Sequence, residues 1–326
     1  MIKRRTFLLQ LAAGALVAPL LQAQQAGKVY TIGLLLSSAG PTARDLRRQE
    51  TLRAALRDLG WVEGKNLVIE IRYAGLDPQR QRELATALKA LPVALIIASG
   101  TITIRAAKDG APGVPVVMVN AGDPVGAGFV ASLARPGGDL SGTSAAGEEV
   151  LAKQVELLSA AVPQLKRVSA LMNSANPANG FFFDAMMARA KQRGLQLDRV
   201  DVTSPGELEG AIARAKGGGL VVLGDPMLLE NRERIIALTL RNQVPSIFGD
   251  RLLANAGGLM SYLSADTWHW RKTAGFVDKI LRGARPADLP VEQPTEFELV
   301  INLKTARALG IAIPQSLLLR ADQVIR

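Results

Sequence analysis

Polar residues that could recognise a small molecule follow the short apolar runs of this sequence. In the first half they are Ser37, Ser38, Ser99, Gly100, Thr101, Asn120 and Asp123, and in the second half Asn173, Asn176, Asn179, Asp225 and Asp250. Their hydroxyl, amide and carboxylate groups can together donate and accept hydrogen bonds. Because open α/β sheets bind ligands at the carboxyl ends of their strands, we predict that these residues contact a small polar ligand.

The segment 99–101 has the strongest chemical signal among them. Its two hydroxyls and the Gly100 amide precede a helical pattern, and the start of a helix attracts carboxylates and other anions. Each polar residue also has a purely structural explanation. Thr101 can cap its helix, Asp225 precedes Pro226 as helix caps often do, and Asn before Pro or Gly favours a turn.

Catalytic chemistry has little support in the sequence. The chain has one histidine, His269, and no cysteine, which excludes Cys/His nucleophilic sites and multi-histidine metal clusters. No G-x-S-x-G motif is present, and Gly122, Gly126 and Gly128 do not follow the G-x-G-x-x-G spacing of a dinucleotide-binding loop. We therefore predict no catalytic residue, no metal and no cofactor, and we interpret His269 as an ordinary helical residue.

Apolar runs alternate with helical patterns along the chain, which indicates parallel sheets covered by helices on both faces. The expected strands are 29–36, 67–73, 95–98, 114–119, 168–172, 195–202, 220–223 and 246–249. The expected helices are 44–59, 79–90, 102–109, 181–193, 207–216, 228–242 and 267–281. Since the pattern restarts near residue 168, and 326 residues are enough for two cores, we predict two α/β lobes of similar build.

Residues 1–23 have the composition of a cleavable export signal, with cleavage after residue 26 as an alternative. Lys3, Arg4 and Arg5 precede an apolar run too short to span a membrane, and both general and twin-arginine export fit this pattern. Without cysteine, the exported chain has neither disulfides nor a lipid anchor. Losing these three basic residues lowers the formal net charge from +10 to +7, and the other basic residues are interspersed with acids, which disfavours a nucleic-acid partner.

Four longer stretches carry a resemblance to a known family. They are DLGWVEGKNLVIEIRYA at 58–74, GDPVGAGFVASLARPGGDLSG at 122–142, AGGLMSYL at 256–263 and the whole of 277–326. These stretches are similar to the ABC-transporter substrate-binding proteins of the type I periplasmic fold, a family that includes tryptophan-binding members. The resemblance implies two Rossmann-like parallel-sheet lobes joined by a three-crossing hinge, with a small ligand held between them.

This resemblance also implies boundaries for the lobes and the hinge. We expect the first lobe at 27–141 and the second at 142–295, with residues 296–326 returning to complete the first lobe. The crossings are expected at 140–144, 256–263 and 296–304. The stretch 119–142, rich in glycine and proline, is then expected at the edge of the cleft, on the approach to the hinge.

The implied activity is that of a non-enzymatic periplasmic receptor that delivers a small molecule to an ABC permease of the inner membrane. We expect an amino acid or another carboxylate as ligand and a monomeric protein, and the aromatic content of 4% disfavours the stacking platforms of a sugar site. A ligand-sensing periplasmic receptor of a signalling system is an open alternative. A dinucleotide-dependent enzyme is a third, opposed by the export signal and the missing glycine loop.

Overall fold

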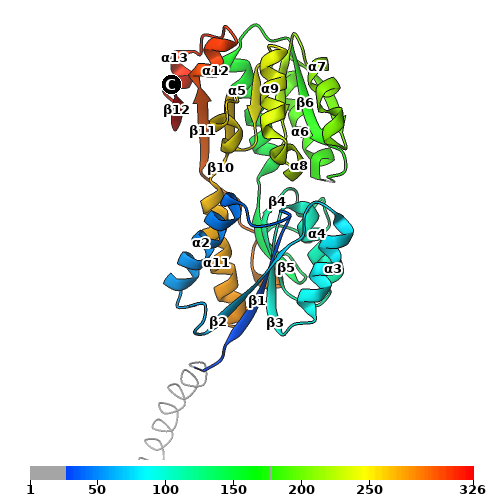
Figure 1. The fold of residues 1–326 in the computed structure, drawn as a ribbon, viewed down its shortest axis with the longest axis vertical. Helices are drawn as coiled ribbons and strands as arrows, with labels where there is room; N and C mark the ends of the chain where they lie inside the picture. Colours follow the sequence, from blue (N-terminus) through cyan, green and yellow to red (C-terminus); the bar gives the residue numbers. More distant parts are fainter. Residues whose placement is uncertain (1–26, 177) are drawn as a thin grey trace, which may run out of the picture.

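Two α/β lobes follow one another along the longest axis of the molecule (Figure 1). The computed structural model describes residues 27–176 and 178–326. The predicted export signal therefore lies outside the described residues. Within the described part of the chain, no helix is long and apolar enough to cross a membrane.

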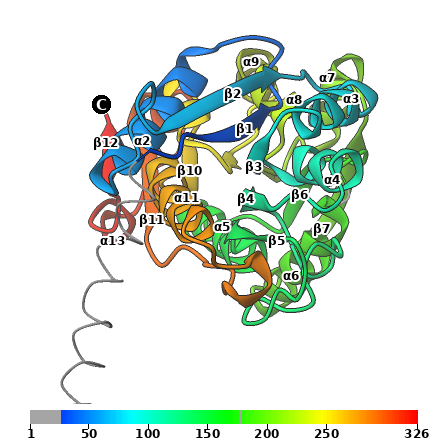
Figure 2. The ribbon, with the colours of Figure 1, turned by 90° about the horizontal axis from the view of Figure 1, so that it is seen from below.

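The first lobe is built on a five-stranded parallel sheet in the order β2-β1-β3-β4-β5. Its strands are β1 (Tyr30–Leu36), β2 (Leu67–Tyr73), β3 (Val93–Ser99), β4 (Val116–Ala121) and β5 (Leu140–Ser144). Its helices are α2 (Ala43–Asp58), α3 (Pro78–Lys89), α4 (Thr101–Gly110) and α11 (Asp266–Leu281). Helices α3 and α4 cover one face of the sheet, and α2 and α11 cover the other (Figure 2). Burial from both sides explains why the central strands are almost continuously apolar.

The second lobe has a seven-stranded sheet in the order β12-β11-β10-β9-β8-β6-β7, parallel except where β10 meets β11. Its strands are β6 (Arg167–Asn173), β7 (Gln196–Val202), β8 (Gly219–Val222), β9 (Ser246–Phe248), β10 (Met260–Ser264), β11 (Phe297–Asn302) and β12 (Gln323–Ile325). Its helices are α5 (Gly147–Ala161), α6 (Ala178–Gln192), α7 (Leu208–Arg214), α8 (Pro226–Glu230), α9 (Arg232–Arg241), α10 (Arg251–Asn255), α12 (Leu303–Ala308) and α13 (Gln315–Leu318). The predicted class of two parallel-dominated α/β lobes is confirmed.

The described chain crosses between the lobes three times. It leaves the first lobe after β5, at residues 145–146, and returns between β10 and α11, at Ala265. A short 3-10 turn, η2 (Pro286–Asp288), and the following residues run beside β5, where Glu292 bridges to Thr143, before the chain enters β11. We expected the crossings at 140–144, 256–263 and 296–304. These ranges fall on or beside β5, β10 and β11, which are the strands next to the three observed crossings.

The structure differs from the predicted lobe boundaries at the C-terminal end. Residues 297–325 do not return to the first lobe, because β11 and β12 extend the sheet of the second lobe. The segment that completes the first lobe is α11, which packs its buried face, including Trp270 and Val277, on that lobe's core. A chain that begins in the first lobe and crosses three times must end in the second.

The stretch 122–139 connects β4 to β5 along the edge of the first lobe. Its Phe129 and Val130 are buried, and the side chains of Arg105 and Lys108 on α4 donate to its backbone carbonyls. Gly122 lines the space between the lobes, and β5 leads directly into the first crossing. The stretch therefore lies between the cleft and the hinge.

Candidate ligand-binding site

A cavity of about 950 Å³ lies between the two lobes and is lined by residues of both. Eleven of the twelve predicted site residues line it, and the exception is Asp123. Those from the first lobe are Ser37, Ser38, Ser99, Gly100, Thr101 and Asn120, and those from the second are Asn173, Asn176, Asn179, Asp225 and Asp250. The cavity gathers these residues because the carboxyl ends of β1, β3, β4, β6, β8 and β9 all lead into it.

The side chain of Asp123 instead forms hydrogen bonds within its own loop. Its Oδ1 accepts hydrogen bonds from the backbone amides of Val125 (3.2 Å) and Gly126 (2.9 Å). The residue borders a separate, smaller cavity of about 200 Å³. The turn-forming explanation of an Asp before Pro accounts for this position.

The first-lobe wall presents the uncapped start of α4. Gly100 occupies the N-cap position with φ of +85°, and no side chain caps the helix. Thr101 does not cap it either, because its Oγ1 accepts a hydrogen bond from the amide of Gly122 at 3.1 Å. The first amides of α4 are therefore left for another acceptor, and the helix dipole favours an anion there.

On the second-lobe wall, Asp225 is a buried carboxylate that only neutral groups contact. Its side chain caps α8 through the amides of Met227 and Leu228, and Asn173 and Asn176 donate their side-chain amides to it at 3.1 and 3.0 Å. The residue is 5% exposed, and no basic side chain of the described residues forms an ion pair with it. A buried charge usually has a counter-charge, so a cationic group of a ligand would complete this site.

Glu230 adds to the negative potential of the same wall. It lies at the end of α8 and lines the cavity. Burial, together with the charge of Asp225, raises the pKa of its carboxyl. Both effects disfavour a second negative charge there, and a ligand cation would offset them.

Five buried polar atoms around the cavity have no hydrogen-bond partner within the described chain. They are Ser38 Oγ, Gln81 Oε1, Asn120 Oδ1, Gln154 Oε1 and Asn179 Oδ1. The orientation of three of these amides is set by their nitrogens, which donate to the backbone carbonyls of Gly75, Tyr262 and Asn173. Unpaired buried acceptors are costly, so the cavity is suited to a ligand rich in N–H or O–H donors.

The sequence analysis did not single out Gln81 and Gln154. Both lie inside helices, α3 and α5, where a glutamine usually faces water. Here both are almost fully buried. Only the packing of two lobes reveals that these helical positions face a cavity.

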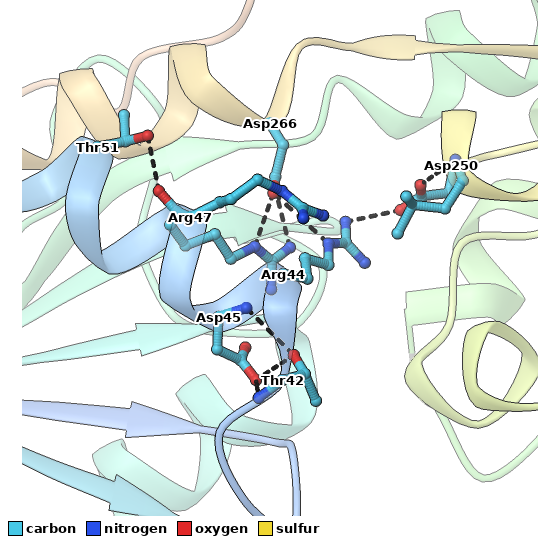
Figure 3. A network of polar contacts seen from close by, with 9 residues as sticks. Thr42, Arg44, Asp45, Arg47, Thr51, Asp250 and Asp266 are labelled. Atoms are coloured by element: carbon cyan, nitrogen blue, oxygen red, sulfur yellow. Dashed lines mark hydrogen bonds and ion pairs between the residues drawn. The ribbon is translucent and has the colours of Figure 1, made fainter. Parts of the chain in front are cut away.

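Arg44, on the first turn of α2, is a third cavity residue that the sequence analysis did not single out. Figure 3 shows its side chain extending toward Asp250 at the start of α10 and toward Asp266 at the start of α11. Arg44 Nη2 lies 2.6 Å from Asp250 Oδ2, and Arg44 Nε lies 3.5 Å from Asp266 Oδ2. Asp250 was predicted as a ligand contact, but its carboxylate instead forms an ion pair with Arg44 across the cleft.

Asp266 is held by a second arginine. Arg48 donates from Nε and Nη2 to the two oxygens of Asp266 at 2.7 and 2.9 Å. Burial opposes ionisation of Asp266, but the charge and hydrogen bonds of Arg48, with the charge of Arg44, outweigh it and hold the pKa of this carboxyl well below its usual range. The group is therefore a fixed anion beside the second crossing.

His269 lies at the hinge rather than on an ordinary helix surface. Its Nε2 is 2.8 Å from Ser264 Oγ at the end of β10, and its Nδ1 is 3.1 Å from Thr143 Oγ1 on β5. The ring thereby links two strands that lead into crossings. Burial lowers its pKa to about 4, so the imidazole is neutral at pH 7. Among the described residues, no group of three or more acidic or histidine side chains could hold a metal ion.

Comparison with known proteins identifies the family. The sequence profile of the ABC transporter substrate binding protein family matches residues 41–325. The chain belongs to this family. Members of the family are solute-binding proteins, so this substrate-binding protein is not an enzyme, as the absence of catalytic motifs predicted.

Individual relatives of this substrate-binding protein bind aromatic amino acids. It is 26% identical to a tyrosine-binding protein of Clostridioides difficile (strain R20291) over 261 residues, which cover 79% of this chain and 74% of the relative. A Streptococcus pneumonia ABC domain in complex with L-Trp superimposes with a TM-score of 0.82, at 24% identity, over 91% of this chain and 100% of the other. A ligand-free, open substrate-binding protein with adhesive properties from Clostridium difficile gives a TM-score of 0.69, at 23% identity, over 91% and 99%.

Proposed function

We propose that this protein binds a free amino acid between its lobes and delivers it to an ABC permease. The α-ammonium group is assigned to Asp225, and the α-carboxylate to the start of α4 with its neighbouring hydroxyls. The observation that carries this proposal is the buried Asp225 carboxylate, which has four neutral donors and forms no ion pair with any basic side chain in the described part of the chain. An ammonium group supplies both the missing charge and donors for the unpaired amide oxygens.

The remainder of the cavity favours an amino acid with an apolar side chain. Aliphatic residues of both lobes form much of the lining, among them Leu76, Val150, Leu151, Met227 and Leu253. The cavity has room for an aromatic side chain, and the tyrosine-binding relative and the L-Trp complex make L-tyrosine and L-tryptophan the first ligands to test.

The place of action follows from the proposed export signal. Residues 1–23 direct the chain to the periplasm, where it acts as a soluble monomer without a lipid anchor. There it binds no nucleic acid, and its partner is the permease of an importer in the inner membrane.

A thermal melting screen of residues 27–326 tests the ligand class. We expect free L-amino acids to raise Tm by mass action, and their deaminated analogues, sugars and dinucleotides to leave it unchanged. Asp225→Asn keeps an N-cap side chain on α8 and removes the charge. Without ligand, its Tm should therefore lie within a few degrees of the parent's Tm, but added amino acid should no longer raise it.

Asp123→Asn is the matched control, because it makes the same change in a loop outside the cavity. This variant should keep the full ligand-induced rise. A rise with sugars or dinucleotides alone would overturn the assignment, and so would an undiminished rise in Asp225→Asn.

A further inference from the structure

Among the ion pairs of residues 27–176 and 178–326, one connects the two lobes across the cleft. It connects Arg44, on α2 of the first lobe, with Asp250, the N-cap of α10 in the second lobe, at 2.6 Å. The two side chains are only 21% and 12% exposed. A pair shielded to this degree is less screened than a surface pair, so it contributes to holding the lobes together.

Arg44 also has a second anion within reach, on its own side of the cleft. Its Nε lies 3.5 Å from Asp266, which is fixed by two hydrogen bonds from Arg48. Asp266 belongs to α11 and therefore to the first lobe. When the lobes separate, Arg44 loses Asp250 but keeps Asp266, so opening does not leave an unpaired arginine.

Asp250 also keeps a hydrogen-bond partner whether the lobes are together or apart. Its Oδ1 accepts the amide of Leu252 at 2.9 Å and caps α10, while only its Oδ2 is engaged by Arg44. Loss of Arg44 leaves the cap intact and exposes the carboxylate to water. Both partners are thus stable apart and together, as a reversible contact requires.

We propose that Arg44 and Asp250 form a latch that stabilises the closed arrangement of the lobes and slows release of the ligand. The latch goes beyond the proposed function, since it concerns how long the cavity stays closed and not which molecule it holds. Arg44 is a positioning residue here, because its donors are directed to Asp250 and Asp266 rather than to the ligand.

Two variants remove the latch without removing neighbouring structure. Asp250→Asn retains an N-cap side chain of equal rank and loses the charge. Arg44→Gln removes the other charge. The matched controls are Arg53→Gln and Arg251→Gln. Arg53→Gln breaks an ion pair with Glu63 inside the first lobe, and Arg251→Gln breaks one with Glu298 inside the second lobe.

The first readout is the distance between the lobes in the ligand-free protein. Because the chain has no cysteine, spin labels can be placed uniquely at Lys89→Cys, at the end of α3, and Lys216→Cys, beyond α7. We expect Asp250→Asn and Arg44→Gln to shift the distance distribution toward longer, open values, and the two controls to keep the distribution of the parent. Unchanged distributions in both latch variants would overturn the proposal.

The second readout is the kinetics of L-tyrosine binding by stopped-flow tryptophan fluorescence. We expect each latch variant to accelerate dissociation about tenfold with little effect on association, since loss of a shielded charge contact acts mainly on release. The double variant should be no faster than the single ones. Additive acceleration, or slower association with unchanged release, would contradict a latch. If the parent does not bind L-tyrosine, the ligand assignment fails, while the distance measurement still tests the latch.

Discussion

Three aspartates near the cleft, of which Asp225 and Asp250 are buried, have different surroundings. Asp266 is paired with two arginines and Asp250 with one, whereas Asp225 has only amide donors. The first two are therefore paired with cations of the protein itself, whereas the proposed ligand would supply the cation for Asp225. The sequence predicted Asp225 and Asp250 equally as ligand contacts, because the arginine that distinguishes them, Arg44, comes from α2, about 200 positions before Asp250 in the chain.

His269 makes the stability of the fold dependent on pH. Its pKa is lowered to about 4 in the folded protein, and a histidine in an unfolded chain titrates near 6.5. Between these values the unfolded state binds a proton that the folded state excludes, so the free energy of unfolding falls as pH falls from 6.5 to 4. The slope is at most about 1.4 kcal/mol per pH unit, or about 3 kcal/mol in total.

Urea unfolding at several pH values between 7 and 4, on the parent and His269→Gln, measures this effect. We expect the glutamine variant to be less stable at pH 7, where it lacks one of the two ring contacts, but to lose less stability on acidification. Asp266, whose pKa is also lowered, adds a further loss only in the more acidic range where free aspartate is protonated. Equal slopes for the two proteins would show that His269 is not the titrating group.

At the scale of elements, the strand β5 depends on a glycine. Gly142 has φ of +140°, and a Cβ at this position would lie 2.1 Å from the carbonyl oxygen of Met118 on the neighbouring β4. Alanine there would force β4 and β5 apart directly before the first crossing. We expect Gly142→Ala to lower the free energy of unfolding by more than about 3 kcal/mol or to prevent folding.

Gly210→Ala is the control for this prediction. Gly210 lies within α7, where a Cβ would meet nothing within 4 Å. Its replacement should raise the free energy of unfolding by about 0.5–1 kcal/mol, because alanine is the better helix former. Denaturant unfolding of both variants separates the two outcomes, and a fully stable Gly142→Ala would contradict the close approach of β4 and β5.

Most strands and long helices were predictable because their apolar periodicity is local. The runs 29–36, 67–73 and 168–172 coincide closely with β1, β2 and β6. The lobe to which α11 belongs was not predictable. Its apolar stripe shows that one face is buried, but two sheets of similar character were available to bury it. Similarly, nothing local in 297–302 shows that β11 pairs antiparallel with β10 in the second sheet.

For the whole molecule, the cleft is a product of chain topology. Three crossings place α11 in the first lobe, return the C-terminal segment to the second, and bring the starts of α2, α4, α8 and α10 to one cavity. The residues after the strands were predictable as a set, because parallel strands present their carboxyl ends together. Arg44, Gln81 and Gln154 were not, since their role depends on how the two lobes face each other.

Calorimetric titration tests the central claim, that the cavity binds an amino acid through both of its charged groups. Residues 27–326 and their Asp225→Asn variant are titrated with L-tyrosine, with phloretic acid, which lacks the ammonium, and with tyramine, which lacks the carboxylate. We predict one L-tyrosine per chain, bound about 100-fold more tightly than either analogue, and a variant that loses this advantage over phloretic acid. Equal affinities for L-tyrosine and phloretic acid, or an unchanged affinity for L-tyrosine in Asp225→Asn, would contradict the account.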